Sequence, residues 1–323
     1  MEFSHTPVLL KEVIDGLNIS PSGVYLDLTL GGGGHSFNIL EKLKTGLLIG
    51  FDKDQDAIDA STNRLSKIAK IYTPENFEKI NSRSALIVKS DFKNAPSVLR
   101  QIGITTVDGI LIDLGVSSFQ LDCAERGFSF KKDAPLDMRM DQSQTLTAKD
   151  IVNSYSQEQL ITLMKVYGEE EFAVSIAKNI VKQRQISPIE TTLQLNEIIE
   201  NSMPKKVVYS RNGASKKVFQ ALRIEVNGEL DRLKETVEEL VSFLAPHGRF
   251  CVISFHSLED RIIKNVFKDF ATNCICPPNF PKCVCGHKAS LKLISHKPIV
   301  ASQEEQKANS RSTCAKLRIA EKI

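Results

Sequence analysis

The sequence predicts an α/β protein in which a mostly parallel sheet is interrupted by an inserted domain of helices. Over residues 1–115, short apolar runs rich in β-branched residues alternate with helical stretches, which is typical of parallel β-α-β units. From Val116 this alternation stops, and candidate helices follow until a strand pattern returns at residues 248–255. A chain of 323 residues is also longer than one core usually supports, which favours two domains.

Four strands are expected in the first part of the sheet. Helical stretches at 36–45 and 56–70 lie between the first three of them. The strands are VYLDLT (24–29), LLIGFD (47–52), ALIVKSDF (85–92) and VDGILIDLG (107–115).

Two helix starts are expected in the inserted segment. Thr147 with Asp150, and Ser156 with Gln159, have the spacing of a capping box, in which each side chain bonds the backbone N–H of the other residue. The next helices are expected from amphipathic patterns, at 170–184 and 192–202.

The remaining sequence returns to the sheet. A long helical stretch at 216–244, bent near Gly228, precedes the strand GRFCVISF (248–255). An edge strand is expected at 292–300 and a last strand at 317–323. We therefore predict a sheet domain made of residues 1–115 and 214–323, with residues 116–213 as the inserted helical domain.

Composition excludes several classes of protein. No apolar run approaches the roughly 20 residues that a membrane-spanning helix needs. The charged residues Glu2, Lys11 and Glu12 do not fit a signal peptide or an anchor at the N-terminus. The odd number of cysteines, seven, does not resemble a secreted disulfide framework. We expect a cytoplasmic protein with no membrane partner.

Each of the four predicted N-terminal strands carries an aspartate at its carboxyl end. These residues are Asp27, Asp52, Asp91 and Asp113. In an open parallel sheet the carboxyl ends of the strands form the ligand-binding edge. Four acids at that edge indicate a ligand with several hydroxyl or amino groups.

The loop after the first strand contains four consecutive glycines, Gly31 to Gly34, followed by His35. Such a loop lets a ligand lie against bare backbone. It lacks the Gly-Lys-Ser/Thr of a phosphate-binding loop and the spacing of the dinucleotide fingerprint. Asp52, at the end of the second strand, is placed to accept hydrogen bonds from the two ribose hydroxyls of an adenosine cofactor.

The charge of the expected ligand separates S-adenosylmethionine from a dinucleotide. Additional carboxylates at Asp27 and Asp113 suit a sulfonium and an ammonium, whereas they would repel a pyrophosphate. Asp91 and Phe92 could then bond the adenine amino group and cover its ring.

The sequence resembles the bacterial 16S ribosomal RNA methyltransferase H family, which methylates N4 of a cytidine in the decoding region of the small ribosomal subunit. The matching segments are spread along nearly the whole chain. They are HTPVLLKEV (5–13), DLTLGGGGHS (27–36), DLGVSSFQLD (113–122), RGFSF (126–130), LDMRMD (136–141), YGEE (167–170), QALRIEVNGEL (220–230), SFHSLEDR (254–261) and SRSTCAKLR (310–318).

The resemblance implies a Rossmann-like class I methyltransferase fold, S-adenosylmethionine as cofactor and 16S rRNA or the small ribosomal subunit as partner. It implies no metal, and it leaves a homodimer open. The residues that it implies as cofactor contacts are Gly33, Gly34, His35, Asp52, Phe92, Asp113 and Gln120.

Asp113 is also our candidate catalytic residue. The cytidine amine is a weak nucleophile, because its lone pair is delocalised into the ring, and a carboxylate that accepts an amino hydrogen would localise that pair. A carboxylate that only positions the cofactor is the alternative role. Second candidates for holding the base or nearby phosphates are Ser117, Ser118, Arg139 and His256, of which His256 could instead belong to a helix start capped by Ser257.

Positive charge is concentrated in residues 214–323, which hold 18 Lys and Arg against 12 Asp and Glu. Phosphate contacts are expected from two groups of basic residues. They are Lys205, Lys206, Arg211, Lys216 and Lys217 near the insertion boundary, and Lys307, Arg311, Lys316 and Arg318 near the C-terminus. Two alternatives remain: a methyltransferase of DNA or a small amine, and an assembly factor that binds RNA without catalysis.

Four cysteines and a histidine crowd a Pro-rich segment, namely Cys274, Cys276, Cys283, Cys285 and His287. Thiolates and imidazole are zinc ligands, but structural zinc sites usually use C-x₂₋₄-C pairs rather than C-x-C. The spacing therefore favours a reduced, metal-free loop, with a structural zinc site as the alternative.

Overall fold

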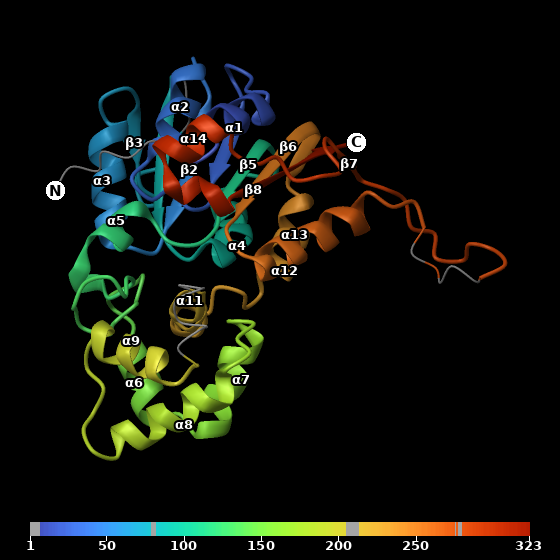
Figure 1. The fold of residues 1–323 in the computed structure, drawn as a ribbon. Coiled ribbons are helices and arrows are strands. Elements are labelled where there is room, and N and C mark those ends of the chain that lie inside the picture. Colours follow the sequence, from blue (N-terminus) through green and yellow to red (C-terminus); the bar gives the residue numbers. More distant parts are fainter. Residues whose placement is uncertain (1–6, 79–81, 205–212, 275, 277–279) are drawn as a thin grey trace. The chain divides into compact units, whose positions relative to one another are not determined.

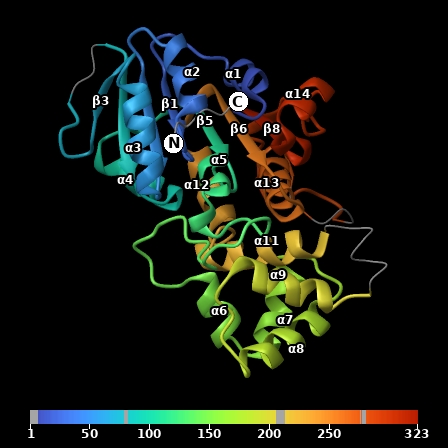
Figure 2. The same cartoon turned by 60° about the vertical axis from the view of Figure 1, so that its left-hand side comes forward.

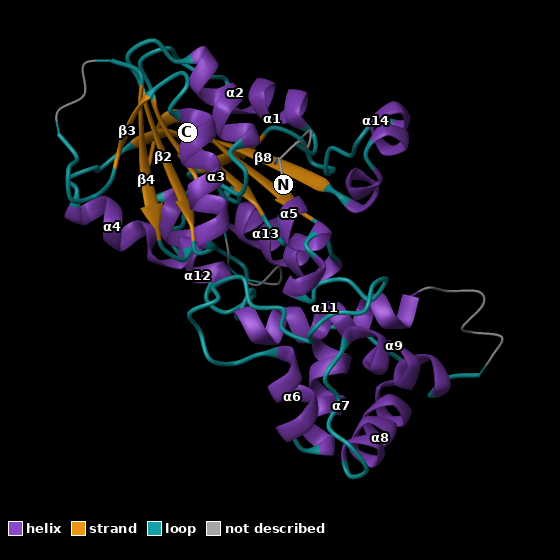
Figure 3. Ribbon diagram, turned by 90° about the vertical axis from the view of Figure 1, so that its left-hand side faces the viewer, coloured by secondary structure: helices purple, strands orange, loops and turns teal. Residues whose placement is uncertain are grey.

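The computed structural model describes the whole chain except residues 1–6, 79–81, 205–212, 275 and 277–279 (Figure 1). The chain divides into two compact units, one made of Met1–Gly115 and Arg232–Ile323 and the other of Val116–Asp231. All strands of the described residues belong to the first unit, whereas the second is built from helices and loops (Figure 3).

The second boundary of the insertion differs from the prediction, which placed it after residue 213. Helix α11 (Gly213–Asn227) belongs to the second unit. Its buried side chains Val218, Phe219 and Leu222 join the core of that unit. An amphipathic pattern shows that a helix has an apolar face, but not which core this face meets.

The sheet confirms the predicted α/β class. In the described residues it has eight strands in the order β3-β4-β2-β1-β5-β6-β8-β7. Neighbouring strands from β3 to β6 are parallel, whereas β8 pairs antiparallel with β6 and β7 antiparallel with β8. The strands are β1 (Val24–Asp27), β2 (Leu47–Asp52), β3 (Lys70–Tyr72), β4 (Ser84–Lys89), β5 (Val107–Asp113), β6 (Leu244–Ser254), β7 (Leu291–Leu293) and β8 (Lys316–Lys322).

Strand order places a ligand-binding edge at the centre of the sheet. From β1 the chain first builds outward on one side, through β2 to β4 and β3, and then crosses to β5 on the other side. Such a reversal opens a crevice at the carboxyl ends of the adjacent strands. Asp27, Asp52 and Asp113 are the last residues of β1, β2 and β5.

Helices cover both faces of the sheet (Figure 2). Alternation along β6 separates the two faces, because Cys251 and Ile253 pack in one cluster with α1, α2 and α3, whereas the Phe250 ring lies 5.4 Å from Phe267 of α13. Burial on both sides explains why these parallel strands are almost continuously apolar. The helices of this unit are α1 (Leu10–Leu17), α2 (Gly34–Lys42), α3 (Gln55–Leu65), α4 (Ala95–Gln101), α12 (Leu233–Val241), α13 (Ser257–Phe270) and α14 (Gln303–Ala308).

The second unit has its own apolar core, and both predicted capping boxes are present at its helix starts. Thr147 and Asp150 cap α6, and Ser156 and Gln159 cap α7. Before α11, the described residues of this unit form the helices α5 (Ser118–Asp122), α6 (Ala148–Ser154), α7 (Gln157–Val166), α8 (Ala173–Arg184) and α9 (Thr192–Asn201). None of the described helices has the length and apolar character that crossing a membrane requires.

Asn227, at the end of α11, holds the LDMRMD segment in place. Its side chain is buried, and its Oδ1 accepts a hydrogen bond of 2.8 Å from the Met140 N–H. Its Nδ2 donates to the carbonyl oxygens of Met138 and Arg223. Met138 has a φ of 64°, so this amide fixes a backbone conformation that a residue with a side chain rarely adopts.

Replacing Asn227 with alanine should lower the free energy of unfolding by about 3 kcal/mol, because buried backbone groups lose their partners. Chemical denaturation, monitored by circular dichroism, would measure this loss of stability. Asn201→Ala, at an exposed position at the end of α9, is the matched control and should change stability by less than about 0.5 kcal/mol. Equal effects of the two substitutions would contradict the role given to Asn227.

Candidate cofactor and active site

The glycine loop joins the end of β1 to the start of α2. Gly33 is the N-cap of the helix, has a φ of 71°, and donates a 2.8 Å hydrogen bond to the Leu30 carbonyl. A Cβ at this position would lie 3.2 Å from the Cβ of Ser61. Glycine is therefore required here both by backbone conformation and by the approach of α3.

Gly33→Ala should destabilise the first unit more than Gly103→Ala does. Gly103 also has a positive φ, 76°, but a Cβ there would meet nothing within 4 Å, so this variant isolates the conformational cost of roughly 1–2 kcal/mol. Gly33→Ala bears the same cost plus the contact with Ser61, and it should also weaken cofactor binding. Thermal denaturation and calorimetric titration would measure the two effects, and equal behaviour of the variants would contradict this assignment.

Asp27 positions the loop from within the protein. Its side chain is only 1% exposed, and its oxygens accept hydrogen bonds from the Ser36 hydroxyl at 2.6 Å and the Thr29 N–H at 3.3 Å. Burial raises the pKa of Asp27 to about 6. These bonds tie Asp27 to the loop and to the start of α2, and a contact of Asp27 with the cofactor stays a prediction.

Asp52 connects the end of β2 to the glycine loop. Its Oδ2 accepts a 2.8 Å hydrogen bond from the Gly31 N–H, and its Oδ1 accepts one of 2.9 Å from the Asp54 N–H. Each oxygen keeps a second lone pair with which it can accept a hydroxyl hydrogen. Burial, with a smaller contribution from the Asp54 and Asp27 charges, raises the pKa of Asp52 to about 6.

Asp91 and Phe92 follow β4, which ends at Lys89 and is shorter than predicted. Asp91 caps a 3₁₀ turn at Phe92–Asn94 by accepting a 3.0 Å hydrogen bond from the Lys93 N–H. The Lys53 ammonium lies 3.4 Å from its other oxygen. Asp91 is thus already engaged by the protein, and Phe92 is half-buried at the edge where β2 and β4 end.

Asp113 is held at the end of β5 with one oxygen unsatisfied. Its N–H donates a 2.6 Å hydrogen bond to the Thr29 hydroxyl. Its Oδ1 is buried and has no hydrogen-bond partner among the described residues. Burial, with the charges of Asp27 and Glu259, raises the pKa of Asp113 to about 8.

His35 lies beside Asp113 and is neutral at physiological pH, because burial lowers its pKa to about 4. Its Nε2 is 3.0 Å from the Val8 carbonyl oxygen. Since a carbonyl only accepts, Nε2 carries the hydrogen and Nδ1 keeps a lone pair. Nδ1 is 3.7 Å from Oδ2 of Asp113, so the ring faces the carboxyl group without adding positive charge.

The residues at this edge fit a cationic adenosyl cofactor. Asp27, Asp52 and Asp113 all have raised pKa values, chiefly because burial disfavours their ionised forms, and a bound positive charge would stabilise those forms. The buried, unpartnered oxygen of Asp113 adds an acceptor without a donor. A ligand with a positive charge and hydroxyl groups would stabilise the ionised carboxylates and offer hydrogen-bond donors. A pyrophosphate would instead add further negative charge.

Gln120 belongs to the second unit and has a local contact there. Its Oε1 accepts a 3.0 Å hydrogen bond from the Ser117 N–H, and its own N–H donates to the Ser117 hydroxyl, forming the capping box of α5. A contact of Gln120 with the cofactor stays a prediction.

Arg139, a second candidate for holding the base or nearby phosphates, directs its guanidinium to Asp137 and to two backbone carbonyl groups.

His256 is itself the N-cap of α13, a position that the sequence suggested for Ser257. Glu259 completes the capping box by accepting a 3.3 Å hydrogen bond from the His256 N–H, it accepts another of 2.8 Å from the Phe255 N–H, and it is 1% exposed. The sequence interpretation missed Glu259 as part of the electrostatic surroundings of Asp113. The His-x-x-Glu spacing was the signal available for its position, but not for its proximity to β5.

Two of the basic residues expected to contact phosphate form ion pairs within the protein, and their phosphate contacts stay predictions. Arg318 bonds Asp260 at 2.7 Å, and the Lys316 ammonium is 3.5 Å from the same carboxylate. An ion pair made within the protein leaves these side chains engaged. Lys216 and Lys307 are exposed, whereas Lys205, Lys206 and Arg211 lie outside the described residues.

Comparison with known proteins agrees with the resemblance seen in the sequence. The family described as the MraW methylase family matches residues 2–323. The chain belongs to this family. The predicted family membership is therefore confirmed, and the match extends over both compact units.

Several proteins are similar to this chain along their full length. A protein named ribosomal RNA small subunit methyltransferase H from Lachnospira eligens is 50% identical, covering 100% of this chain and 99% of the relative. Proteins of the same name from Finegoldia magna and Clostridium botulinum (strain Kyoto / Type A2) are 48% and 50% identical, each with 100% of both chains covered.

Proposed function

We propose that this MraW-family methylase transfers a methyl group from S-adenosylmethionine to N4 of a cytidine in 16S rRNA of the small ribosomal subunit. Full-length identity of 48–50% to relatives named ribosomal RNA small subunit methyltransferase H carries the proposal. The carboxylates at the sheet edge support a cationic donor. The reaction would take place in the cytoplasm, and a homodimer stays a prediction for sedimentation analysis.

Bound S-adenosylmethionine would supply an electrophilic methyl carbon on a sulfonium. The protein's contribution would be to hold the amine in line with that carbon, because alignment supplies much of the rate in a displacement of this kind. Asp52 would accept the ribose hydroxyls, and the glycine loop would bring backbone N–H groups against the ligand.

Asp113 would act on the amine. Its free Oδ1 would accept an amino hydrogen, which directs the nitrogen lone pair toward the methyl group. With a pKa of about 8 in the free protein, this carboxyl group has a basicity suited to removing a proton near neutral pH. The Asp113 backbone is held by its N–H bond to the Thr29 hydroxyl, which would fix the position from which the carboxyl group acts.

The test is transfer of labelled methyl groups from the cofactor to four substrates in parallel: small ribosomal subunits lacking the modification, naked 16S rRNA, DNA and free cytidine. Nuclease digestion and mass spectrometry should find N4-methylcytidine in ribosomal RNA, from the subunit or the naked RNA. Label in DNA or free cytidine alone would contradict the proposal. Binding of cofactor and RNA without transfer would instead indicate a non-catalytic assembly factor.

A further inference from the structure

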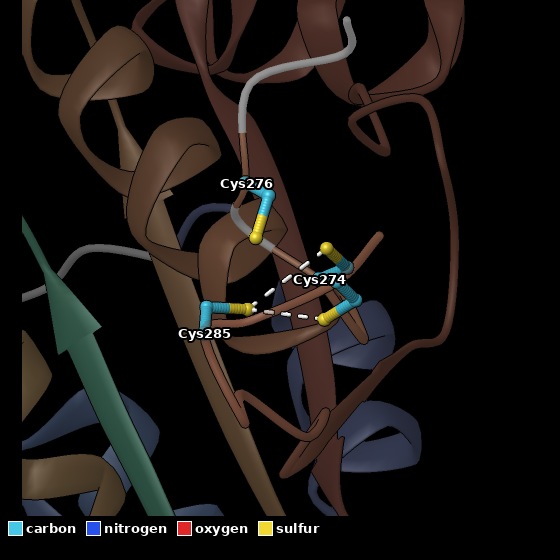
Figure 4. Close-up of side chains that lie close together, drawn as sticks. Cys274, Cys276 and Cys285 are labelled. Carbon is cyan, nitrogen blue, oxygen red and sulfur yellow. Dashed lines mark hydrogen bonds between the residues drawn. The ribbon is translucent and has the colours of Figure 1, made fainter. Parts of the chain in front are cut away.

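Four cysteine side chains converge in the segment between α13 and β7. The sulfur atoms of Cys274, Cys276, Cys283 and Cys285 all lie within 4.8 Å of one another. Figure 4 shows the side chains of Cys274, Cys276 and Cys285 lying close together. The Cys283 and Cys285 sulfurs are 3.5 Å apart, and those of Cys285 and Cys274 are 3.9 Å apart. We propose that these four thiolates bind one structural zinc ion.

The sulfur spacing matches a tetrahedral site. With zinc–sulfur bonds of about 2.3 Å, the sulfurs of a tetrahedral site are about 3.8 Å apart. The two measured distances lie on either side of this value. A disulfide would need the paired sulfurs at about 2.0 Å, and all seven cysteines are free.

The C-x-C spacing had favoured a metal-free loop, but the course of the backbone allows the two C-x-C pairs to form one metal site. The two pairs come from opposite ends of the segment and face each other, so each pair supplies one side of the tetrahedron. Gly286, directly after Cys285, has a φ of 61° and turns the chain there. His287 is not among the converging groups, because its Nε2 lies 3.1 Å from the Asp269 carbonyl oxygen.

The segment offers little else that would hold it together. Its large apolar side chains are exposed, with Phe280 at 52% and Val284 at 72%. No strand or helix is present among its described residues, and long loops of this kind are uncommon without a stabilising element. A metal ion would provide the cross-link that small units without a core require.

Charge in the segment also suits the metal. Binding would release the four thiol protons and leave a complex with two negative charges. Lys282 and Lys288 belong to the same segment, and residues 271–290 contain no aspartate or glutamate. These basic residues would offset part of the negative charge of the complex, and no acid in the segment competes for the metal.

Metal analysis of the full chain tests the proposal directly. Protein purified in reducing buffer, without an affinity tag or chelator, should contain about one zinc per chain by mass spectrometry. Cobalt exchanged into the site should show the intense visible bands of tetrahedral cobalt with thiolate ligands. A metal-free protein with four reactive thiols and no such bands would overturn the proposal, and so would one equivalent of iron in place of zinc.

Cysteine variants provide the matched comparison. Cys274→Ser and Cys283→Ser should each lose the metal and become more sensitive to trypsin at Lys282 and Lys288. Cys314→Ser removes an exposed cysteine outside the cluster and should retain both metal and resistance. Cys123→Ser should behave in the same way. Metal retained in both cluster variants, or lost in both controls, would refute the assignment without reference to methyl transfer.

Discussion

Replacing Asp113 with asparagine should strongly slow methyl transfer while making the free protein more stable at alkaline pH. Asparagine keeps an acceptor oxygen but cannot take the proton that the amine loses, which should lower the rate by about 10²- to 10⁴-fold. The fold raises the pKa of Asp113 from its ordinary value to about 8, so ionisation of this group opposes folding. Asparagine does not ionise and avoids that penalty.

The sign of the stability change identifies its cause. The folded protein binds the Asp113 proton more tightly than the unfolded chain does, so the wild-type protein loses stability as pH rises from about 4 to about 8. The advantage of Asp113→Asn should grow across this interval and become constant above it. Denaturant titrations at several pH values would measure it, and an advantage that shrinks with rising pH would contradict the explanation.

Asp108→Asn is the control on the same strand. Asp108 lies toward the opposite end of β5, where its Oδ2 accepts a 2.7 Å hydrogen bond from the Val24 N–H. The asparagine oxygen can still accept this bond, so methyl transfer should remain close to that of the wild type. Full activity in Asp113→Asn would remove Asp113 from the chemistry, leaving it a structural carboxyl group.

Affinity for S-adenosylmethionine should rise as pH increases from about 6 to about 8, by up to about tenfold per pH unit. Asp113 is mostly protonated in the free protein below its pKa of about 8, and a bound cation favours the ionised form. Binding in this range should therefore release a proton. Calorimetry in two buffers of different ionisation enthalpy would count the protons released.

Two controls separate this linkage from general effects of pH. S-adenosylhomocysteine has a neutral sulfur and should show a weaker dependence, and Asp113→Asn should flatten the dependence for S-adenosylmethionine. An affinity that is independent of pH, or that falls as pH rises, would show that Asp113 does not face the positive charge of the cofactor.

Local patterns predicted the elements that carry the site. The two predicted capping boxes of the insertion depend on residues three apart, and Asp27, Asp52 and Asp113 stand at strand ends because apolar runs stop there. Strand β3 was missed because it is three residues long and only Tyr72 is buried. Periodicity cannot detect so short an element.

Contacts between distant residues could not be predicted. Three such contacts depend on tertiary packing. They are the approach of His35 to Asp113, the charge of Glu259 near Asp113, and the ion pair of Arg318 with Asp260. The cysteine cluster shows the same limit, because a spacing rule for ligand pairs says nothing about two pairs that meet across a turn. For the same reason, the pattern of α11 could not assign it to a domain.

The insertion between β5 and β6 affects the order in which the chain can fold. These strands are neighbours in the sheet, yet the whole second unit is synthesised between them. Until β6 emerges, one edge of β5 stays unpaired, with the fully apolar side chains of Ile110, Leu111 and Ile112 beside it. During translation the nascent chain therefore exposes an unpaired strand edge that can pair with other chains. Early folding of the insertion around its own core would shorten the flexible connection between β5 and β6 and so lower the entropy cost of pairing them.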